Sequence, residues 1–151
     1  MFENPEKKNT TFRVVLDTGI RVRYVIKPNF RCIDAAMADL QLVPLYSQEL
    51  RNKLFEVLQR PRFVKYITPN DLEAVFTIID DFGKMIPVTS NRKLCRDPDD
   101  DFILNLALDS DADYIVSGDK DLLSMNLVEN IPIIGIKKLK ELLEKIGRAH
   151  V

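Results

Sequence analysis

The sequence predicts one α/β domain in which a central parallel sheet of about five strands is covered by helices on both faces. The chain has 151 residues, which is the size of a single ordinary domain. Five short apolar runs alternate with segments whose apolar residues recur at helical spacing. No internal repeat, linker or low-complexity segment divides the chain. Strands that alternate with helices are typical of βα units, and such units build parallel sheets.

The five apolar runs are the candidate strands. They cover residues 12–16, 42–45, 85–88, 114–116 and 131–134. The first run is rich in β-branched residues and ends at Asp17. Pro44, Pro87 and Pro132 fall in three of the others. We expect these prolines at strand starts or sheet edges, because proline cannot donate a hydrogen bond to a ladder.

Three segments between and after the strands carry helical signals. Ser47 is a good N-cap for a helix with apolar residues at helical spacing up to Leu58. Thr68 followed by Pro69 predicts the start of a second helix. A closing amphipathic helix carries four apolar residues over 139–146, and we expect it to end at Gly147.

Composition excludes several classes of protein. Hydrophobic residues make up 46% and charged residues 30%, as in soluble globular proteins, and no apolar run approaches the roughly 20 residues of a membrane span. Two cysteines and one histidine, His150, exclude the usual zinc clusters and a disulfide framework, and they argue against His-dependent nucleophilic catalysis. Residues 1–11 form a polar N-terminal extension unlike a signal peptide. We therefore expect a cytoplasmic protein with no membrane partner.

The net charge of −1 hides an uneven distribution. Residues 1–65 carry 12 Lys and Arg against 7 Asp and Glu, whereas residues 66–151 carry 10 against 16. The segment from Asp97 to Asp121 alone contains nine Asp and a single base, Lys120. Such asymmetry indicates the charge of a partner rather than the fold.

Carboxylates occur where an open α/β sheet binds ligands, beyond the carboxyl ends of its strands. Asp17 follows the first strand, and Asp119 follows the fourth. A third group, residues 97–101, contains four Asp and opens a helix. Crowded carboxylates repel each other unless they share a cation, and oxygen ligands select Mg²⁺ or Mn²⁺. The pattern therefore indicates a metal-dependent phosphoryl-transfer or nuclease site.

Each acidic group also has a simpler structural interpretation. Asp97 with Pro98 is an ordinary helix start, and a lone aspartate after a strand is often a turn residue. Asp119 could cap a short helix with Asp121 near its start. Asp109 and its neighbours at 111 and 113 could be solvated loop acids. The joint position of the groups at one sheet edge is what favours the metal site.

Four motifs resemble the PIN-domain family. They are Arg13-Val14-Val15-Leu16-Asp17-Thr18, Arg60-Pro61-Arg62-Phe63, Asp97-Pro98-Asp99-Asp100-Asp101, and the segment from Ala112 to Leu123. The resemblance runs from about Phe12 to Ile146 and is strongest to toxin components of toxin–antitoxin pairs, related to VapC-type ribonucleases. It implies that residues 12–151 form a three-layer α/β/α PIN-like domain. It also implies an endoribonuclease that uses Mg²⁺ or Mn²⁺ to activate water against RNA phosphodiesters.

The resemblance further implies roles for particular residues. Asp17, Asp101 and Asp119 match metal ligands of the family, and Asp121 lies where a further acid often stands. Ser117 occupies a Ser or Thr position beside the last ligand. Among such relatives an antitoxin is the usual protein partner, and homodimers are common.

Two positions depart from the family pattern. Gly19 replaces an Asn or Ser, and Lys53 falls where the second acidic ligand is expected. Lys53 could neutralise the remaining acids, which would leave a catalytically degenerate domain that binds RNA or a protein partner. Alternatively, Glu49 or Glu56 could replace the missing acid, or Lys53 could simply pair with Glu49 on the surface.

Three arginines, Arg21, Arg23 and Arg92, are candidates for RNA contact. Scattered basic residues more often form only a solvated surface, but Arg21 and Arg23 follow the first strand closely. A phosphoacceptor domain is a weaker hypothesis, because Asp17-Thr18-Gly19 lacks a second Asp.

Overall fold

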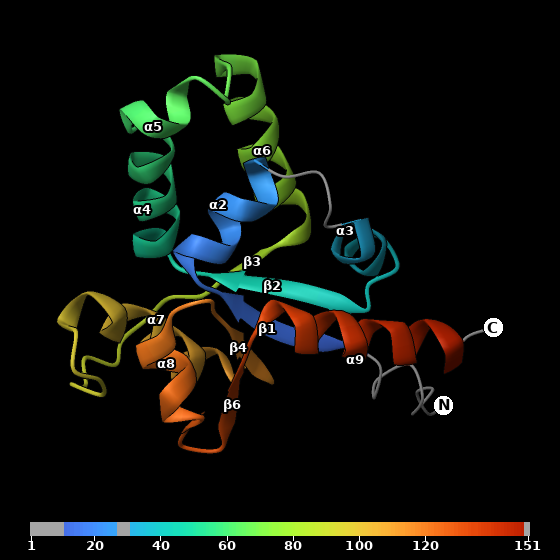
Figure 1. Ribbon diagram of the computed structural model, residues 1–151. Helices are drawn as coiled ribbons and strands as arrows, with labels where there is room; N and C mark the ends of the chain where they lie inside the picture. The colour runs from blue at the N-terminus through green and yellow to red at the C-terminus, as the bar shows by residue number, and fades with distance from the viewer. Residues whose placement is uncertain (1–10, 27–30, 150–151) are drawn as a thin grey trace.

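The computed structural model describes residues 11–26 and 31–149, and Figure 1 shows how their helices and strands are arranged. The extension expected over residues 1–11 lies outside the described residues except for Thr11, and so does His150. Within the described part, six strands form one mostly parallel sheet flanked by helices. The expected α/β fold is therefore confirmed, with one strand more than the apolar runs indicate.

The sheet has the strand order β3-β2-β1-β4-β6-β5. Its strands are β1 (Phe12–Leu16), β2 (Leu42–Tyr46), β3 (Lys84–Met85), β4 (Tyr114–Val116), β5 (Leu127–Val128) and β6 (Ile131–Ile134). Every neighbouring pair is parallel except β5 with β6. Because β1 and β4 are adjacent and parallel, the segments that follow them leave the sheet at the same edge.

Two expectations about the strands are wrong. The run 85–88 contributes only its first residue to β3, and Pro44 lies inside β2, between two other strands. β3 pairs only with Leu45 and Tyr46, so no ladder bond to β3 requires the N–H that Pro44 lacks.

The helices of the described part are α2 (Thr18–Ile26), α3 (Arg31–Ala38), α4 (Gln48–Leu58), α5 (Pro61–Val64), α6 (Pro69–Phe82), α7 (Pro98–Ser110), α8 (Lys120–Met125) and α9 (Ile136–Ala149). Ser47 caps α4, and Thr68 forms a capping box with Asp71 at the start of α6. The end predicted at Gly147 is wrong, because α9 continues to Ala149. No glycine of the described residues has the positive φ that a glycine cap requires.

The two faces of the sheet bury different helices. Val14, Leu16 and Val116 pack with apolar residues of α2, α3 and α9. Val15 and Ile115, which alternate with them along the strands, pack with residues of α4, α7 and α8. This alternation produces the helix–sheet–helix layers that the family resemblance implies.

A third apolar cluster holds α2 to α4 and α6, through residues that include Val22, Leu54 and Phe76. Figure 1 shows that α4, α5 and α6 rise away from the sheet on the side of β2. Of these helices, α4 starts just after the end of β2, near the edge at which Asp17 lies.

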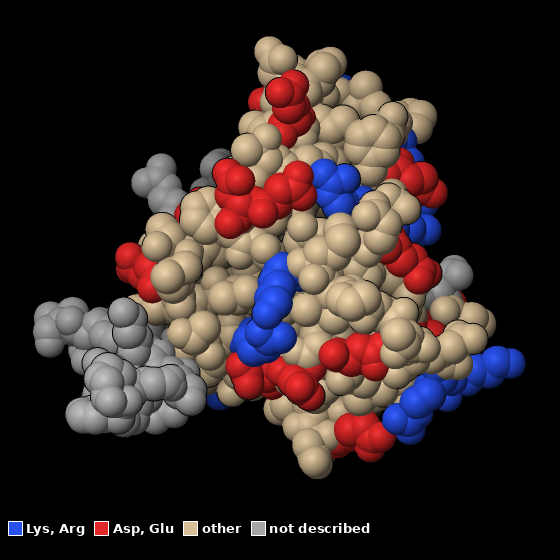
Figure 2. Space-filling model, turned by 180° about the vertical axis from the view of Figure 1, so that it is seen from behind, with Lys and Arg blue, Asp and Glu red and all other residues tan. Residues whose placement is uncertain are grey.

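Charge on the surface is mixed rather than continuous. On the face opposite to that of Figure 1, Figure 2 shows several separate acidic groups, and the basic groups lie beside acidic ones. No unbroken basic band crosses the described part of this face. This face therefore has no extended electrostatic track of the kind that would follow a nucleic-acid backbone.

Candidate active site

Two neighbouring strands, β1 and β4, carry the residues at the centre of the candidate site. Their last residues, Leu16 and Val116, are paired in register. The N–H of Asp17 donates to the carbonyl of Val116 at 3.0 Å. Asp17 and the segment 117–119 therefore lie side by side, although they are far apart in sequence.

Asp17 is buried, with 8% of its surface exposed. Its Oδ1 accepts from the N–H of Ile20 at 2.8 Å, and its Oδ2 accepts from the hydroxyl of Ser117. Burial is the largest influence on the Asp17 pKa and raises it above 3.8. The hydrogen bonds from Ser117 and Ile20 oppose that rise, and the nearby Asp119 carboxylate adds to it. Asp17 is thus an oriented carboxylate beside a second one.

Ser117 links the two carboxylate-bearing segments. It is fully buried, donates to Asp17 and accepts from the N–H of Asp119 at 2.9 Å. Asp119 caps α8, because its Oδ1 accepts from the N–H groups of Asp121 and Leu122. The other oxygen of Asp119 makes no hydrogen bond with the described residues. A capping role therefore leaves this aspartate one oxygen for a ligand.

These residues open onto a cavity of about 430 Å³. The cavity lies between the start of α2, α4, the start of α7 and the loop from β4 to α8. Its lining residues are Asp17, Thr18, Gly19, Ile20, Arg23, Lys53, Asp100, Phe102, Ile103, Gly118 and Asp119. Three carboxylates and two bases from separate elements thus share one hollow with apolar walls.

Asp100, not Asp101, is the acid of α7 that lines the cavity. Asp101 Oδ1 accepts instead from the N–H groups of Leu94 and Cys95, at 2.9 and 3.0 Å, and from the Cys95 thiol at 3.1 Å. The hydrogen bond from Leu94 is the largest cause of the lowered pKa of Asp101. Consecutive residues of a helix point about 100° apart, so the two acids face different surroundings. Asp101, which the family resemblance gives as a metal ligand, therefore does not line the cavity, whereas its neighbour Asp100 does.

Asp101 belongs to a row of polar side chains on α7, which we call the α7 polar row. This row holds the segment 89–95 by hydrogen bonds to its backbone. The other members of the row are Asn105 and Asp109, which follow at four-residue spacing and lie on the same helix face. Asn105 donates through Nδ2 to the carbonyl of Arg92 at 3.0 Å, and its Oδ1 accepts from the N–H of Arg92 at 3.1 Å. Asp109 accepts from the N–H groups of Thr89 and Ser90 and from the Ser90 hydroxyl. Asp109 is thus a structural anchor and not a solvated loop acid, a role that its spacing from Asp101 could have indicated.

Lys53 and Arg23 are the bases that line the cavity. Lys53 is half-buried and Arg23 is exposed. Neither makes an ion pair within 4.0 Å in the described part of the chain, so no contact pair with Glu49 forms there. Glu49 and Glu56 are exposed and do not line the cavity, and Glu56 pairs with Arg60 at 2.9 Å. Neither glutamate therefore replaces the missing acid.

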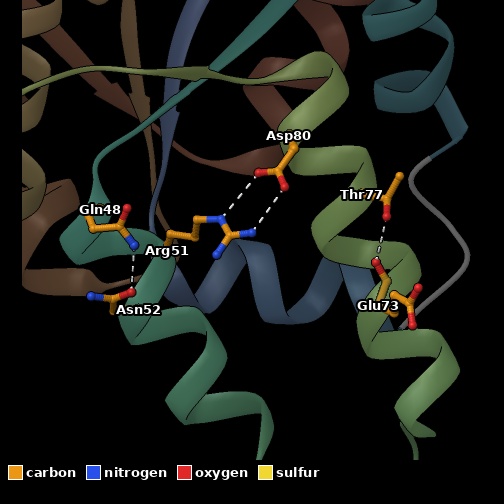
Figure 3. Close-up of polar contacts among 6 residues, drawn as sticks. All are labelled: Gln48, Arg51, Asn52, Glu73, Thr77 and Asp80. Carbon is orange, nitrogen blue, oxygen red and sulfur yellow. Dashed lines mark hydrogen bonds and ion pairs between the residues drawn. The ribbon is translucent and has the colours of Figure 1, made fainter.

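The orientation of α4 is fixed by contacts on another side of the helix. Figure 3 shows Arg51 of α4 donating through Nε and Nη2 to Asp80 of α6, at 3.3 and 3.1 Å. The Arg51 guanidinium also lies 4.7 Å from the centroid of the Phe76 ring. Arg51 and Lys53 are two positions apart and point about 200° apart on a helix. The brace to α6 therefore turns Lys53 toward the cavity.

Gly19 lies in the first turn of α2. A Cβ on it would meet Asp17 Oδ1 at 3.6 Å, an ordinary contact distance. The Asn or Ser expected from the family pattern would therefore fit here without strain.

Arg21 is not available for RNA contact, because it is buried with 6% of its surface exposed. Its Nε donates to the carbonyl of Leu16 and its Nη2 to that of Leu45, both at 2.8 Å. Burial lowers the pKa of Arg21 to about 10. Arg21 thus joins the ends of β1 and β2 from within the core.

Two further candidates lie outside the cavity lining. Arg92 is exposed and pairs with Glu129 at 2.8 Å. Asp121 is exposed, and its carboxylate lies 3.9 Å from Arg96. Of the sequence candidates, the cavity brings together Asp17, Asp119, Arg23 and Lys53, with Ser117 behind them.

The described residues contain no group of three or more His, Cys, Asp or Glu side chains arranged to hold one metal ion. In the same part of the chain, no helix combines the length and apolar character needed to cross a bilayer.

Comparison with known proteins agrees with the fold. The model of the PIN domain family matches residues 13–121. The chain is also 30% identical over 118 residues to the uncharacterized protein MJ1680 of Methanocaldococcus jannaschii, an alignment that covers 75% of this chain and 74% of the relative. No solved structure gives a significant match.

Proposed function

The chain belongs to the PIN domain family, and from this premise we propose that it is an endoribonuclease that hydrolyses RNA phosphodiester bonds in the cavity. The observation that carries the proposal is that Asp17, Asp100 and Asp119, from three separate elements, line one hollow at the carboxyl edge of the sheet. Ligand sites of open α/β sheets lie at this edge.

We propose Mg²⁺ or Mn²⁺ as the cofactor, because the acidic side chains of the cavity offer only hard oxygen donors. Asp119 is close enough to Asp17 to raise the pKa of Asp17. Two carboxylates that share a cation must lie close together in this way. Mg²⁺ is commonly held by one or two carboxylates, with water and substrate phosphates completing its shell. A protein cluster of three acids is therefore not required, and Asp100 is the candidate for further support.

The bound ion would supply an activated water and stabilise charge on the phosphate. The residues of the chain orient the carboxylates that hold it. Ser117 and the N–H of Ile20 fix Asp17, while the capping bonds of Asp119 fix the start of α8. Asp121 lies outside the cavity and is not part of the proposed ligand set.

The decisive experiment is cleavage of a pool of cellular RNA by the Asp17→Asn variant in the presence of Mn²⁺. We expect cleavage to be lost because the amide cannot replace the carboxylate as a charged ligand. Asp39→Asn is the matched control, because Asp39 is exposed and follows α3, away from the cavity. Full cleavage by a folded Asp17→Asn variant would contradict the proposed site.

The biological role that we propose is the toxin of a toxin–antitoxin pair acting in the cytoplasm. This role is supported by the resemblance in sequence, with an antitoxin protein as partner and a homodimer as the assembly to look for. Growth arrest on expression, abolished by Asp17→Asn, is the expected result. Light scattering of the purified chain would measure the assembly.

A second candidate function is a PIN domain that binds RNA or a protein without hydrolysing RNA. Lys53 in the cavity is the observation that favours it, because an ammonium group cannot ligate a metal ion. Calorimetric titration with Mn²⁺, with and without RNA, separates the two candidates. Binding that is lost in Asp119→Asn supports the nuclease, and no binding by the wild type under either condition supports the second candidate.

A further inference from the structure

The cavity contains two bases that come from different helices and line it together with the carboxylates. Arg23 belongs to α2 and Lys53 to α4, and these helices pack against each other. Asp17 and Asp119 come from the strand ends, and Asp100 comes from α7. The hollow is thus lined by both signs of charge, supplied by different elements.

Lys53 and Arg23 differ from two other basic residues, one on α4 and one just after it, because they have no counter-ion among the described residues. Arg51 pairs with Asp80, and Arg60 pairs with Glu56. Lys53 and Arg23 form no ion pair within 4.0 Å with a described residue. Lys53 is unpaired although it is half-buried, where an unpaired charge destabilises the fold more than it would at the open surface.

The carboxylates do not require these bases for their own stabilisation. Asp17 is satisfied by Ser117 and by the N–H of Ile20, and Asp119 accepts two backbone hydrogen bonds. A contact ion pair would be expected if Lys53 served as an internal counter-ion, and none is present among the described residues. The two positive groups therefore remain available to an anionic ligand.

Gly118 lies beside one of the two bases. A Cβ on Gly118 would lie 3.4 Å from Arg23 Nη1, an ordinary contact distance, so the guanidinium lies next to the Gly118 backbone. Arg23 is thus close in space to the segment that carries Asp119.

We propose that Lys53 and Arg23 form a two-point clamp for a backbone phosphate of the RNA, so that the protein itself supplies positive charge inside the cavity. The identity of the ligand as RNA rests on the proposed function. Lysine acts on a phosphate as a point charge, whereas the arginine fork can donate two parallel hydrogen bonds. The clamp holds the phosphate facing the carboxylates, where an ion bound by them would also touch it.

The test measures RNA binding without cleavage. A short random-sequence RNA with 2′-O-methyl sugars is titrated with protein in EDTA at several salt concentrations, with fluorescence anisotropy as the readout. The variants are Lys53→Gln and Arg23→Gln, and Lys53→Arg should rescue the first. Lys145→Gln is the matched control, because Lys145 is exposed on α9 and does not line the cavity.

Each clamp substitution should weaken binding and make the slope of log K against log salt less steep, by at most about 0.7, the value for one phosphate contact on a single strand. Lys145→Gln should leave both unchanged. If Lys53→Gln and Arg23→Gln behave like Lys145→Gln, the clamp is wrong.

A parallel cleavage assay on unmodified RNA with Mn²⁺ separates this inference from the nuclease proposal. If the slope falls as expected but the wild type does not cleave, the hydrolysis proposal fails and the clamp stands. If Asp17→Asn abolishes cleavage while Lys53→Gln leaves the slope unchanged, the nuclease stands and the clamp fails. If the wild type does not bind the RNA at all, the clamp is overturned.

Discussion

At the scale of single residues, the most consequential side chain outside the cavity is Arg21. Its guanidinium bonds the carbonyls at the ends of β1 and β2, immediately before Asp17 and Tyr46. Arg21 therefore sets the position from which Asp17 leaves the sheet.

We predict that Arg21→Met lowers the free energy of unfolding by about 2–4 kcal/mol, because two buried carbonyls lose their hydrogen bonds to the guanidinium. Urea unfolding followed by circular dichroism measures the loss. Arg23→Met, on the same helix but exposed, should change the free energy of unfolding by at most about 0.5 kcal/mol. Equal effects of the two substitutions would contradict the role given to Arg21.

Ser117 is the second residue whose role can be tested alone. Ser117→Ala removes the donor to Asp17 and the acceptor for the Asp119 N–H. We predict a loss of about 10–100-fold in Mn²⁺ affinity or cleavage rate, as is typical when a partner that orients a metal ligand is removed. Ser117→Thr keeps the hydroxyl and should retain most of the activity. A Ser117→Ala variant as active as the wild type would remove Ser117 from the site.

The position of Asp17, Ser117 and Asp119 at one sheet edge could be predicted from the sequence, because Asp17 and Ser117 directly follow neighbouring strands and Asp119 comes two residues after Ser117. The sequence does not predict the choice between Asp100 and Asp101, because that choice depends on the rotation of α7. The rotation is set by the α7 polar row, whose partners in 89–95 are backbone groups. The four-residue spacing of Asp101, Asn105 and Asp109 indicates a shared helix face. Backbone partners leave no mark in the residue types, however, so the motif 97–101 alone does not give the rotation.

At the scale of elements, α7 organises the loop beside the site. The segment 86–97, which follows the short strand β3, has no regular secondary structure in most of its length. Its backbone groups therefore lack ladder partners, and the α7 polar row supplies them. The same helix presents Asp100 to the cavity, so the loop and the site are coupled through one element.

We predict that Asp109→Ala loosens this loop and lowers the free energy of unfolding by about 1–2 kcal/mol, because two N–H groups lose a charged acceptor. Amide hydrogen exchange should become faster at Thr89 and Ser90, while the amides of β1 stay protected. Asp81→Ala, at an exposed position of α6, is the control. Unchanged exchange at Thr89 would contradict the anchoring role.

The same contact predicts a dependence on pH. Hydrogen bonds from Ser90 are the largest cause of the lowered pKa of Asp109, which lies below 3.8 in the folded state. The stabilisation by Asp109 is therefore complete above pH 3.8 and is lost as the pH falls through the folded-state pKa. The difference in unfolding free energy between the wild type and Asp109→Ala should shrink over that acidic range. A constant difference would show that the carboxylate charge is not involved.

Sequence patterns fail to predict an element when they fit two kinds of secondary structure or when the element is too short to show a pattern. In α2, Arg21 and Arg23 alternate with Val22 and Tyr24, which resembles a strand, yet the arginines serve the core and the cavity, respectively. β5 has only two residues and pairs antiparallel with β6, so it carries no periodicity of its own. Tertiary contacts decide both cases, whereas Ser47 and Thr68 mark their helices by local hydrogen bonds alone.

At the scale of the whole molecule, the net charge of −1 means that long-range attraction cannot supply most of the RNA affinity. Basic groups lie beside acidic groups on the face in Figure 2. The base-rich segment 62–66, in and after α5, would be an alternative contact for the proposed RNA, because Arg62 and Lys65 are exposed and lie over Phe63 and Tyr66. The number of phosphate contacts therefore distinguishes a local clamp from an extended track.

We predict a slope of log K against log salt of about −0.7 for the wild type binding uncleavable RNA in EDTA, since the clamp neutralises one phosphate. A double substitution Arg62→Gln and Lys65→Gln should leave this slope unchanged if RNA contacts only the cavity. A wild-type slope steeper than about −3, reduced by the α5 double substitution, would mean that the RNA also follows α5. The wild-type slope would then count the contacts along that path, and the cavity would hold only one end of a longer strand.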